Sequence, residues 1–363
     1  MLVWCVSGSA LQAQTLFDAF KPHFTLPRNY ICYQTTDSLT IDGKLTEKAW
    51  QLAQWSEDFV DIEGDLQPRP THATRVKMLW NTQYLYIAAE LEEPHVWATL
   101  HQHDTIIFQD NDFEVFLDPD GDAHEYFEIE INAHNTVMDL FMPKPYRDGG
   151  RALLTWDTKG LRTAVHVTGT LNQPNDKDQR WTVEMAIPIH AVRFFNGPGI
   201  PQNNSIWRIN FSRVQWDTDI KNGTYVKRRH ANGRPLPEHN WVWSPQGTIN
   251  MHAPERWGYL QFSTQPPGSA PAAFQLPESA TAKNYLWLIY YKQREYRQKN
   301  KHYATTLAAL GIPEKVTAEN GKVYSLELES ISTQFKAAVN GGSLKNIWQI
   351  NQEGKVFPGK PSL

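Results

Sequence analysis

The sequence contains little cysteine, no large excess of charge and no long hydrophobic run. Only two cysteines, Cys5 and Cys32, occur in 363 residues. The net charge is −4, from 35 basic and 39 acidic residues, so the chain lacks the basic field on which nucleic-acid binding depends. No segment is apolar over a length that would span a bilayer. We therefore expect neither a nucleic-acid-binding nor a membrane-spanning protein.

The first residues form a short apolar segment followed by small residues. Residues 1–14 read MLVWCVSGSALQAQ, which is typical of the last part of a secretory signal peptide cleaved near Ala13. Cleavage would remove Cys5 and leave Cys32 as the last cysteine, so no disulfide within the chain is expected. The segment predicts an exported protein, located in the periplasm, on the cell surface or outside the cell.

The middle of the chain has the pattern of many short β-strands. Apolar runs at 75–80 and 84–89 are separated by a short polar loop and predict a hairpin. A second hairpin is expected from residues 112–118 and 125–132, which flank the turn sequence Asp-Pro-Asp-Gly-Asp. Further strands are expected at residues 161–171, 181–187, 205–214 and 257–262. Together these strands predict a mainly β domain, an antiparallel β-sandwich over residues 30–263.

The last hundred residues have a different composition. Residues 264–281 are rich in Pro, Ala, Ser and Gly, which is typical of a linker. Apolar residues then recur at helical spacing over 282–310, and Gly311 and Pro313 are expected to end this helix. Alternating patterns follow between 324 and 356. Residues 282–363 are therefore expected to form a small α+β region with an antiparallel sheet, which is a candidate site for a partner protein.

Acidic side chains gather on one face of the second predicted hairpin. Side chains alternate between the faces of a strand, so Asp112 and Glu114 share one face, as do Glu128 and Glu130. Antiparallel pairing brings the four together, where like charges repel each other. Three interpretations stay open: a solvated face, a ligand-binding surface, and a cation site. For the last, Asp112, Glu128 and Glu130 are the candidate ligands of calcium, which prefers oxygen.

Aromatic residues are plentiful, with 14 Trp, 14 Tyr and 16 Phe. A flat aromatic side chain can cover the C–H face of a sugar ring, while carboxylates, amides and arginine bind the hydroxyls at its rim. Trp241 and Trp243 lie beside turn-forming residues, and Trp216 and Trp97 lie on other irregular segments. These four are candidates for stacking on a sugar. The alternative, that Trp241 and Trp243 fill the end of the sandwich, stays open.

A catalytic interpretation rests on the same acidic residues. Glu114, Glu128, Glu130 and Glu184 could supply the carboxylate pair of a glycosidase, but neighbouring sheet positions give a crowded pair, with no hydrophobic pocket evident to raise one pKa. No motif of a serine hydrolase, zinc peptidase or phosphate-binding loop occurs. His101 and His103 alternate, which is a weak metal pattern. We expect a non-catalytic protein. Two alternatives stay open: glycosidase activity through Glu114, Glu128 and Glu130, and a cell-surface protein that interacts with other proteins through its C-terminal region.

Six segments in order resemble the family 9 carbohydrate-binding modules. The opening, residues 39–50, reads LTIDGKLTEKAW, a short strand, an Asp42-Gly43 turn and a helical turn with Thr46 as N-cap. The other segments are YLYI at 84–87, NDFEVFLD at 111–118, WTVEMAIP at 181–188, WRINFSR at 207–213 and WGYLQF at 257–262. The resemblance implies a β-sandwich that binds carbohydrate over about residues 30–262.

The resemblance also implies roles for single residues. Family modules that bind the reducing ends of glucans and xylans clamp the sugar between two Trp and bind calcium structurally. Matching the segments places Phe108 at the first clamp position, Met251 near the second and Glu114 on the hydroxyl-binding carboxylate. Glu128 stands where the family has a basic residue, and Arg213 is expected to bind hydroxyls or a uronate. The resemblance thus predicts recognition of a poly- or oligosaccharide in carbohydrate catabolism.

Overall fold

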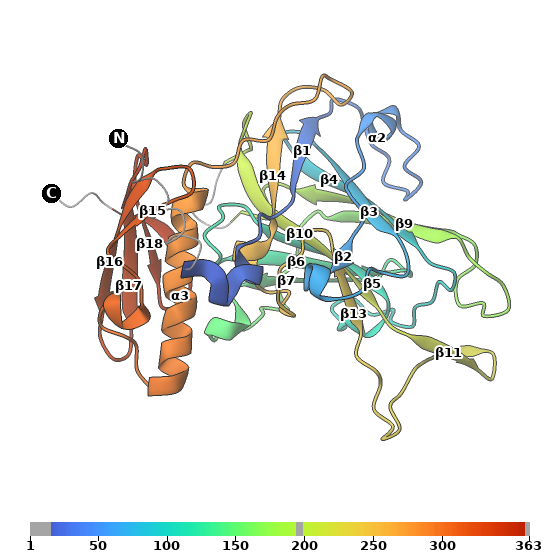
Figure 1. Cartoon of the computed structure of the whole chain (residues 1–363). Coiled ribbons are helices and arrows are strands. Elements are labelled where there is room, and N and C mark those ends of the chain that lie inside the picture. The colour runs from blue at the N-terminus through green and yellow to red at the C-terminus, as the bar shows by residue number, and fades with distance from the viewer. Residues whose placement is uncertain (1–15, 194–198, 360–363) are drawn as a thin grey trace, which may run out of the picture. The chain divides into compact units, whose positions relative to one another are not determined.

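The computed structural model describes residues 16–193 and 199–359; the predicted signal peptide lies outside these ranges. Two compact units are present, shown in Figure 1. The larger consists of residues 27–121 and 125–274. The smaller consists, within the described ranges, of residues 16–26, 122–124 and 275–359. None of the described helices combines the length and the apolar composition that crossing a membrane demands.

The larger unit is built on one twelve-stranded sheet that curls into a sandwich (Figure 1). Its main path runs β7-β6-β5-β10-β14-β1-β3-β4-β9-β8, with β13 beside β10 and β2 beside β13. The strands are β1 (Asn29–Gln34), β2 (Val60–Asp61), β3 (Thr74–Trp80), β4 (Tyr84–Glu92), β5 (Asp112–Asp118), β6 (Tyr126–Asn132), β7 (Val137–Met142), β8 (Arg162–Thr168), β9 (Arg180–Pro188), β10 (Ile206–Gln215), β13 (His239–Val242) and β14 (Gly258–Ser263). A separate hairpin joins β11 (Thr218–Lys221) and β12 (Thr224–Lys227).

The expected mainly antiparallel sandwich is confirmed, with one exception in strand direction. Pairs within the sheet are antiparallel except those of β1, which is parallel to both β14 and β3. The main core contains residues from both halves of the sheet: Met78 and Ile87 from β3 and β4, and Val115 and Ile129 from β5 and β6. Each alternates with residues of the other face, as a strand with one face toward a core requires. Full burial of such a side chain contributes about 1.5–3 kcal/mol.

The opening segment is anchored by a single carboxylate from a distant strand. Glu184 on β9 accepts hydrogen bonds from the backbone N–H groups of Asp42 and Gly43, both at 3.0 Å, and from Nε1–H of the fully buried Trp50 at 2.8 Å. Gly43 has φ +78, and a Cβ there would lie 2.8 Å from the backbone nitrogen of His166. Glu184 therefore has a structural role, and the suggestion of a catalytic one is wrong.

Two local predictions for this segment are also wrong. Residues 39–41 are not a strand, and the N–H of Thr40 among them is bound by a side chain and not by a sheet neighbour. Helix α2 (Lys48–Leu52) begins after Glu47, so Thr46 is not its N-cap. Glu47 does not cap the helix with its side chain either. Its Oε1 instead accepts a hydrogen bond from the N–H of Thr40.

The smaller unit consists of a long helix on an antiparallel sheet, as predicted. Helix α3 (Ala280–Asn300, orange in Figure 1) packs on strands β17 and β18. The sheet order is β15 (Lys315–Thr317), β16 (Val323–Ser330), β17 (Phe335–Gly341), β18 (Ile347–Asn351) and β19 (Val356–Gly359).

Helix α3 ends ten residues before the predicted position. Lys301 takes a left-handed conformation with φ 67, and its N–H bonds to the carbonyl of Arg297, which closes the helix as a C-cap. Leu307 and Leu310 continue the apolar pattern of α3 in the sequence. They pack in the same hydrophobic cluster as the buried residues of α3, although they lie beyond the end of the helix. Leu310 closes a separate short turn, Ala308–Leu310. The pattern thus identified buried positions correctly but not the length of the helix.

Candidate functional site

The acidic face of β5 and β6 lines a pocket of about 310 Å³. Glu114 and Glu130 face each other across the two strands, and Phe116 faces Glu128. The pocket wall combines carboxylates, aromatic rings and aliphatic side chains: Ile106, Phe108, Glu114, Phe116, Glu128, Glu130, Met138, Leu140, Tyr146, Ala152, Leu154, Val214, Glu238, Asn240, Met251 and His252. We call it the acidic pocket. Its strand carboxylates are almost fully buried, which excludes the interpretation as an open, solvated sheet face.

Not every carboxylate oxygen in and beside this pocket has a hydrogen-bond partner. Oε2 of Glu128 is buried without a hydrogen-bond partner, and so is Oδ2 of Asp112, which lies close to Glu114 and Glu130 without lining the pocket. Burial, the largest cause, raises the pKa of Glu114 to about 7 and raises the pKa values of Asp112, Glu128 and Glu130 well above their ordinary range. No Lys or Arg stands among the described residues of the pocket wall. The pocket is therefore prepared for a ligand that donates hydrogen bonds or carries positive charge.

Part of the predicted cation set comes together here. Asp112, Glu114 and Glu130 each place one carboxylate oxygen within 4.8 Å of the others. Glu128 lines the pocket but does not belong to that group, whereas Asp112 belongs to the group without lining the pocket. Three carboxylates, one with an unpartnered oxygen, suit the oxygen chemistry of calcium. These three would hold the ion, and calcium at this position stays a prediction.

Phe108 lies at the pocket wall, and two of the predicted Trp support it from behind. Its N–H donates to Oε2 of Glu130 at 3.0 Å, and its carbonyl accepts the Nε1–H of Trp216 at 2.8 Å. Trp97 and Trp216 pack in one small cluster with Phe108 and are less than a tenth exposed. Neither Trp lines the pocket. Their position predicts that they orient Phe108, and the expectation that they stack on a ligand is not met in this structure.

Arg213 cannot reach the pocket. It pairs in register with Phe113, so its side chain lies on the core face of β10, while its neighbour Val214 lines the pocket. The guanidinium is 1% exposed and donates to Oε2 of Glu93 and Oγ1 of Thr74, both at 3.0 Å. The prediction that Arg213 binds hydroxyls is therefore wrong, because neighbouring residues of a strand point to opposite faces and the pocket lies on the face of Val214.

Trp241 and Trp243 are core residues. They are 4% and 1% exposed and belong to the main hydrophobic core. Trp243 packs against Phe211 and lies so close to Gly258 that a Cβ there would be 2.2 Å from its ring. Of the two alternatives, filling the sandwich is the one that the structure supports.

Several pocket residues gave no signal in the sequence. Tyr146 reaches the pocket from the short 3-10 helix η4 (Tyr146–Asp148) and His252 from a loop, and both lie outside the predicted strands. Nδ1 of His252 lies 2.9 Å from the hydroxyl of Tyr126, and burial lowers the pKa of His252 to about 4. Glu238 and Asn240 could have been inferred, because they alternate with the core residue Trp241.

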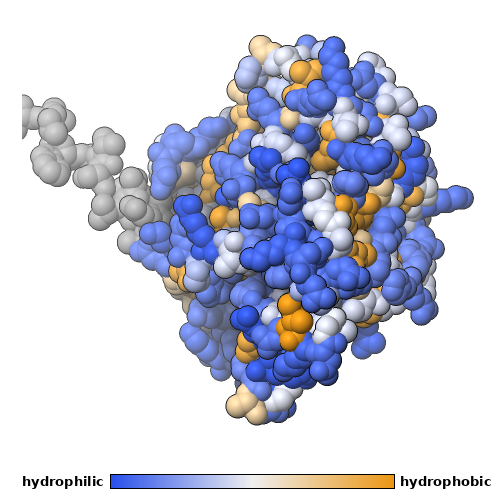
Figure 2. Space-filling view, turned by 90° about the vertical axis from the view of Figure 1, so that its right-hand side faces the viewer, coloured by the Kyte–Doolittle hydropathy of each residue, from blue (hydrophilic) through white to orange (hydrophobic). Residues whose placement is uncertain are grey.

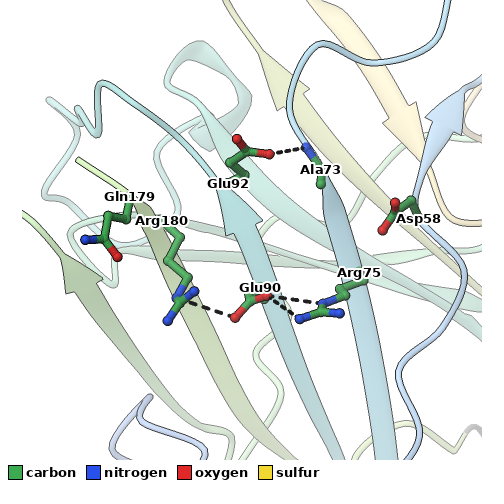
Figure 3. Close-up of a pocket in the computed structure, with 7 residues that line it drawn as sticks. All are labelled: Asp58, Ala73, Arg75, Glu90, Glu92, Gln179 and Arg180. Atoms are coloured by element: carbon green, nitrogen blue, oxygen red, sulfur yellow. Dashed lines mark hydrogen bonds and ion pairs between the residues drawn. The ribbon is translucent and has the colours of Figure 1, made fainter. Parts of the chain in front are cut away.

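A second pocket of about 320 Å³ lies on β3, β4 and β9, and we call it the charged pocket (Figure 3). Glu90 lies between two arginines, 2.8 Å from a nitrogen of Arg75 and 3.4 Å from Nε of Arg180. Glu92 accepts the N–H of Ala73 at 3.2 Å. The charged side chains of Arg75, Glu90 and Arg180 are thus paired with each other, and that of Glu92 is paired with the backbone.

The surface in Figure 2 is dominated by hydrophilic residues. On this face hydrophobic residues form small separate patches. Isolated patches of this kind are normal for a folded protein and mark no particular site.

The sequence matches the family described as "Carbohydrate family 9 binding domain-like" over residues 41–233, just over half of the chain. The chain belongs to this family. The matched region contains Phe108 and Glu114 and ends before Met251 and His252, so this family 9-like chain completes its pocket with residues outside the match. Curated proteins gave no significant match.

Solved structures with similarity to this family 9-like chain are distant. A Bacteroides uniformis protein, named a candidate carbohydrate-binding protein, is 15% identical, with 65% of this chain and 100% of that chain covered and a TM-score of 0.48. A family 9 module from Caldicellulosiruptor kristjanssonii, solved with cellotriose and with glucose, is 14% identical, with 68% and 100% covered and a TM-score of 0.39.

Proposed function

We propose that this chain is an exported, non-catalytic protein that binds a poly- or oligosaccharide in the acidic pocket and supports carbohydrate catabolism. The observation that carries the proposal is that Phe108 and Glu114 line one pocket. These are the residues that the family resemblance places at a sugar clamp and at a hydroxyl-binding carboxylate. Membership of the family supports carbohydrate as the class of ligand.

The pocket offers both kinds of contact that a sugar ring requires. The rings of Phe108 and Tyr146 supply flat apolar surface for the C–H groups of the sugar. Glu114, with a pKa of about 7, carries a proton on part of the molecules near neutral pH. A protonated carboxyl group donates one hydrogen bond and accepts others, which matches a hydroxyl group that does the same.

The electrostatics favour recognition over hydrolysis. A glycosidase keeps one carboxyl protonated and the other ionised by giving them different surroundings. Here burial raises the pKa values of Asp112, Glu128 and Glu130 in the same direction. The described pocket wall supplies no Lys or Arg that would keep one of them ionised. This common shift supports a binding role.

Calorimetry and affinity electrophoresis with soluble plant and algal polysaccharides test the proposal. The parent chain is expected to bind at least one glycan, and Glu114→Gln and Phe108→Ala are expected to weaken binding at least tenfold. Glu90→Gln, which changes the charged pocket in the same way, serves as the matched control and should bind like the parent. A correctly folded parent that binds no glycan in the panel would sink the proposal.

The alternative, hydrolysis through Glu114, Glu128 and Glu130, makes a different prediction. It requires the parent to release reducing sugar from a bound glycan, and Glu114→Gln to abolish that release while Phe108→Ala retains some of it. The non-catalytic proposal expects no release from any glycan that binds.

Export and partner binding need experiments of their own. The pattern of residues 1–14 supports export, and fractionation of cells that produce the tagged chain should find it outside the cytoplasm. Recovery in the cytoplasm alone would contradict export. Binding of a partner protein by residues 282–363 stays a prediction.

A further inference from the structure

Three separate segments of the larger unit bring one histidine and three aspartates together. His103 and Asp104 lie in the loop before the short helix η3 (Ile107–Gln109), Asp139 lies on β7, and Asp157 lies in the loop that follows β7. Each offers one ligand atom, and all four atoms lie within 4.8 Å of one another. We call this group the His103 cluster.

The His103 cluster is separate from the acidic pocket. Met138 and Leu140 line that pocket, and Asp139 lies between them on β7, so its side chain lies on the opposite face of the strand. Oδ2 of Asp139 accepts the N–H of Thr158. Oδ1 of Asp139 is buried without a hydrogen-bond partner. It faces the other members of the cluster and lies 3.9 Å from Nε2 of His103. A nearly inaccessible carboxylate oxygen therefore points at the ligand atoms of its neighbours.

The charges within the cluster do not balance. Nε2 of His103 lies 3.2 Å from Oδ1 of Asp157 and 3.4 Å from Oδ1 of Asp104. Oδ1 of Asp104 is also buried without a hydrogen-bond partner. A single imidazolium would offset one of three negative charges at most. A divalent ion in place of the proton would offset two, and it would also give both unpartnered oxygens a ligand role.

We propose that the His103 cluster binds one divalent transition-metal ion, of the type of Zn²⁺ or Mn²⁺. The imidazole decides the class, because calcium and magnesium take oxygen ligands, whereas zinc and manganese accept one nitrogen among carboxylates. Access is open, since the side chains of His103 and Asp157 are 56% and 67% exposed. A bound ion would join the loop of His103 to β7. The proposal does not depend on carbohydrate binding.

Calorimetry with the full chain, first treated with a chelator and then dialysed, tests the site. Zn²⁺ and Mn²⁺ are titrated separately, and binding of one ion per chain to the parent is expected. His103→Asn and Asp157→Asn are expected to weaken binding at least tenfold, because each removes a direct ligand. Asp157 is exposed, so its variant is not expected to disturb folding, whereas Asp139 is buried. His101→Asn, two residues away and outside the cluster, is the matched control and should bind like the parent.

Cobalt gives a second measurement, because the visible absorption of Co²⁺ reports on its ligands. The parent is expected to give d–d bands that His103→Asn changes and His101→Asn does not. The proposal is overturned if the parent binds neither Zn²⁺ nor Mn²⁺, or if both variants of the cluster bind like the parent. It is equally overturned if binding disappears in Asp112→Asn and persists in His103→Asn, because the ion would then belong to the acidic pocket.

Discussion

The acidic pocket and the charged pocket are similar in size, at about 310 and 320 Å³, but they differ in whether their charged side chains have partners. In the charged pocket, Glu90 lies between Arg75 and Arg180. At the acidic pocket, Oε2 of Glu128 in the wall and Oδ2 of Asp112 beside it are buried without a hydrogen-bond partner. A pocket whose charges pair with each other has little left to offer a ligand, whereas unpaired buried groups gain free energy when a ligand satisfies them.

Solvent sharpens the contrast. The side chains of Arg75, Glu90 and Arg180 are between 22% and 46% exposed, so water weakens their ion pairs. Asp112 is fully buried, and this loss of contact with water disfavours its charged form and raises its pKa. The comparison teaches that pocket volume and number of charges are poor guides to a binding site, and that unpaired buried groups are a better one.

The largest expected effect is the dependence of stability on pH. Glu114 keeps its proton in the folded chain up to a pKa of about 7, but loses it near 4.5 when unfolded. The folded state therefore binds the extra proton between these values, and stability falls as pH rises through this window. For Glu114 the loss is about 3 kcal/mol. Urea unfolding from pH 5 to 8 measures it, and Glu114→Gln should flatten the slope. A parent that gains stability over this range would contradict the prediction.

A second effect is expected from Asp112→Asn at pH 8 with a chelator present. The amide keeps an oxygen for the N–H of Val214, which lies 3.3 Å from Oδ1 of Asp112, and it cannot ionise, whereas burial disfavours the ionised form of Asp112 and raises its pKa. The free energy of unfolding should rise by about 1–2 kcal/mol. Thermal unfolding measures the change. Lower stability of the variant under these conditions would show that the carboxylate is already satisfied. Reversal of the effect by added calcium would support the predicted ion.

Third, Phe108→Ala should weaken glycan binding at least tenfold, which corresponds to about 1.4 kcal/mol or more, through loss of the flat apolar surface. Phe108→Trp should restore or exceed the affinity of the parent, because it retains an aromatic face. Calorimetry with the same glycan measures both. Equal binding by the Ala variant and the parent would remove Phe108 from the site.

The smallest effect belongs to the charged pocket. Glu90→Gln should lower the free energy of unfolding by less than about 1 kcal/mol, since exposed ion pairs contribute little. Glycan binding should not change. A loss of glycan binding in this variant would break the comparison, since it would assign the ligand to the wrong pocket.

Strand alternation made part of this structure predictable from the sequence. The register that places Glu114 opposite Glu130 follows from the hairpin pattern. Burial of this face does not, because it depends on irregular segments outside the hairpin, such as those that hold Tyr146 and His252. Local patterns contain no information on such contacts.

The errors at aromatic and charged residues have the same origin. Trp241 and Trp243 have the composition of a sugar site but pack in the core. Arg213 pairs with Glu93, which lies far away in the sequence and does not belong to the acidic face. For such residues the choice between core and site depends on which face of the sheet the side chain takes, and the resemblance to the family did not supply that face.

The parallel pairing of β1 with β14 also constrains how the chain is made. β1 lies near the start of the larger unit and β14 near its end, with Asn29 in register with Tyr259. During synthesis, β1 therefore cannot pair with β14 until nearly the whole larger unit has been translated. A topology with such distant partners has a high contact order and is expected to fold slowly. Premature stops before residue 258 should therefore leave β1 with an unpaired edge, which is a site for aggregation.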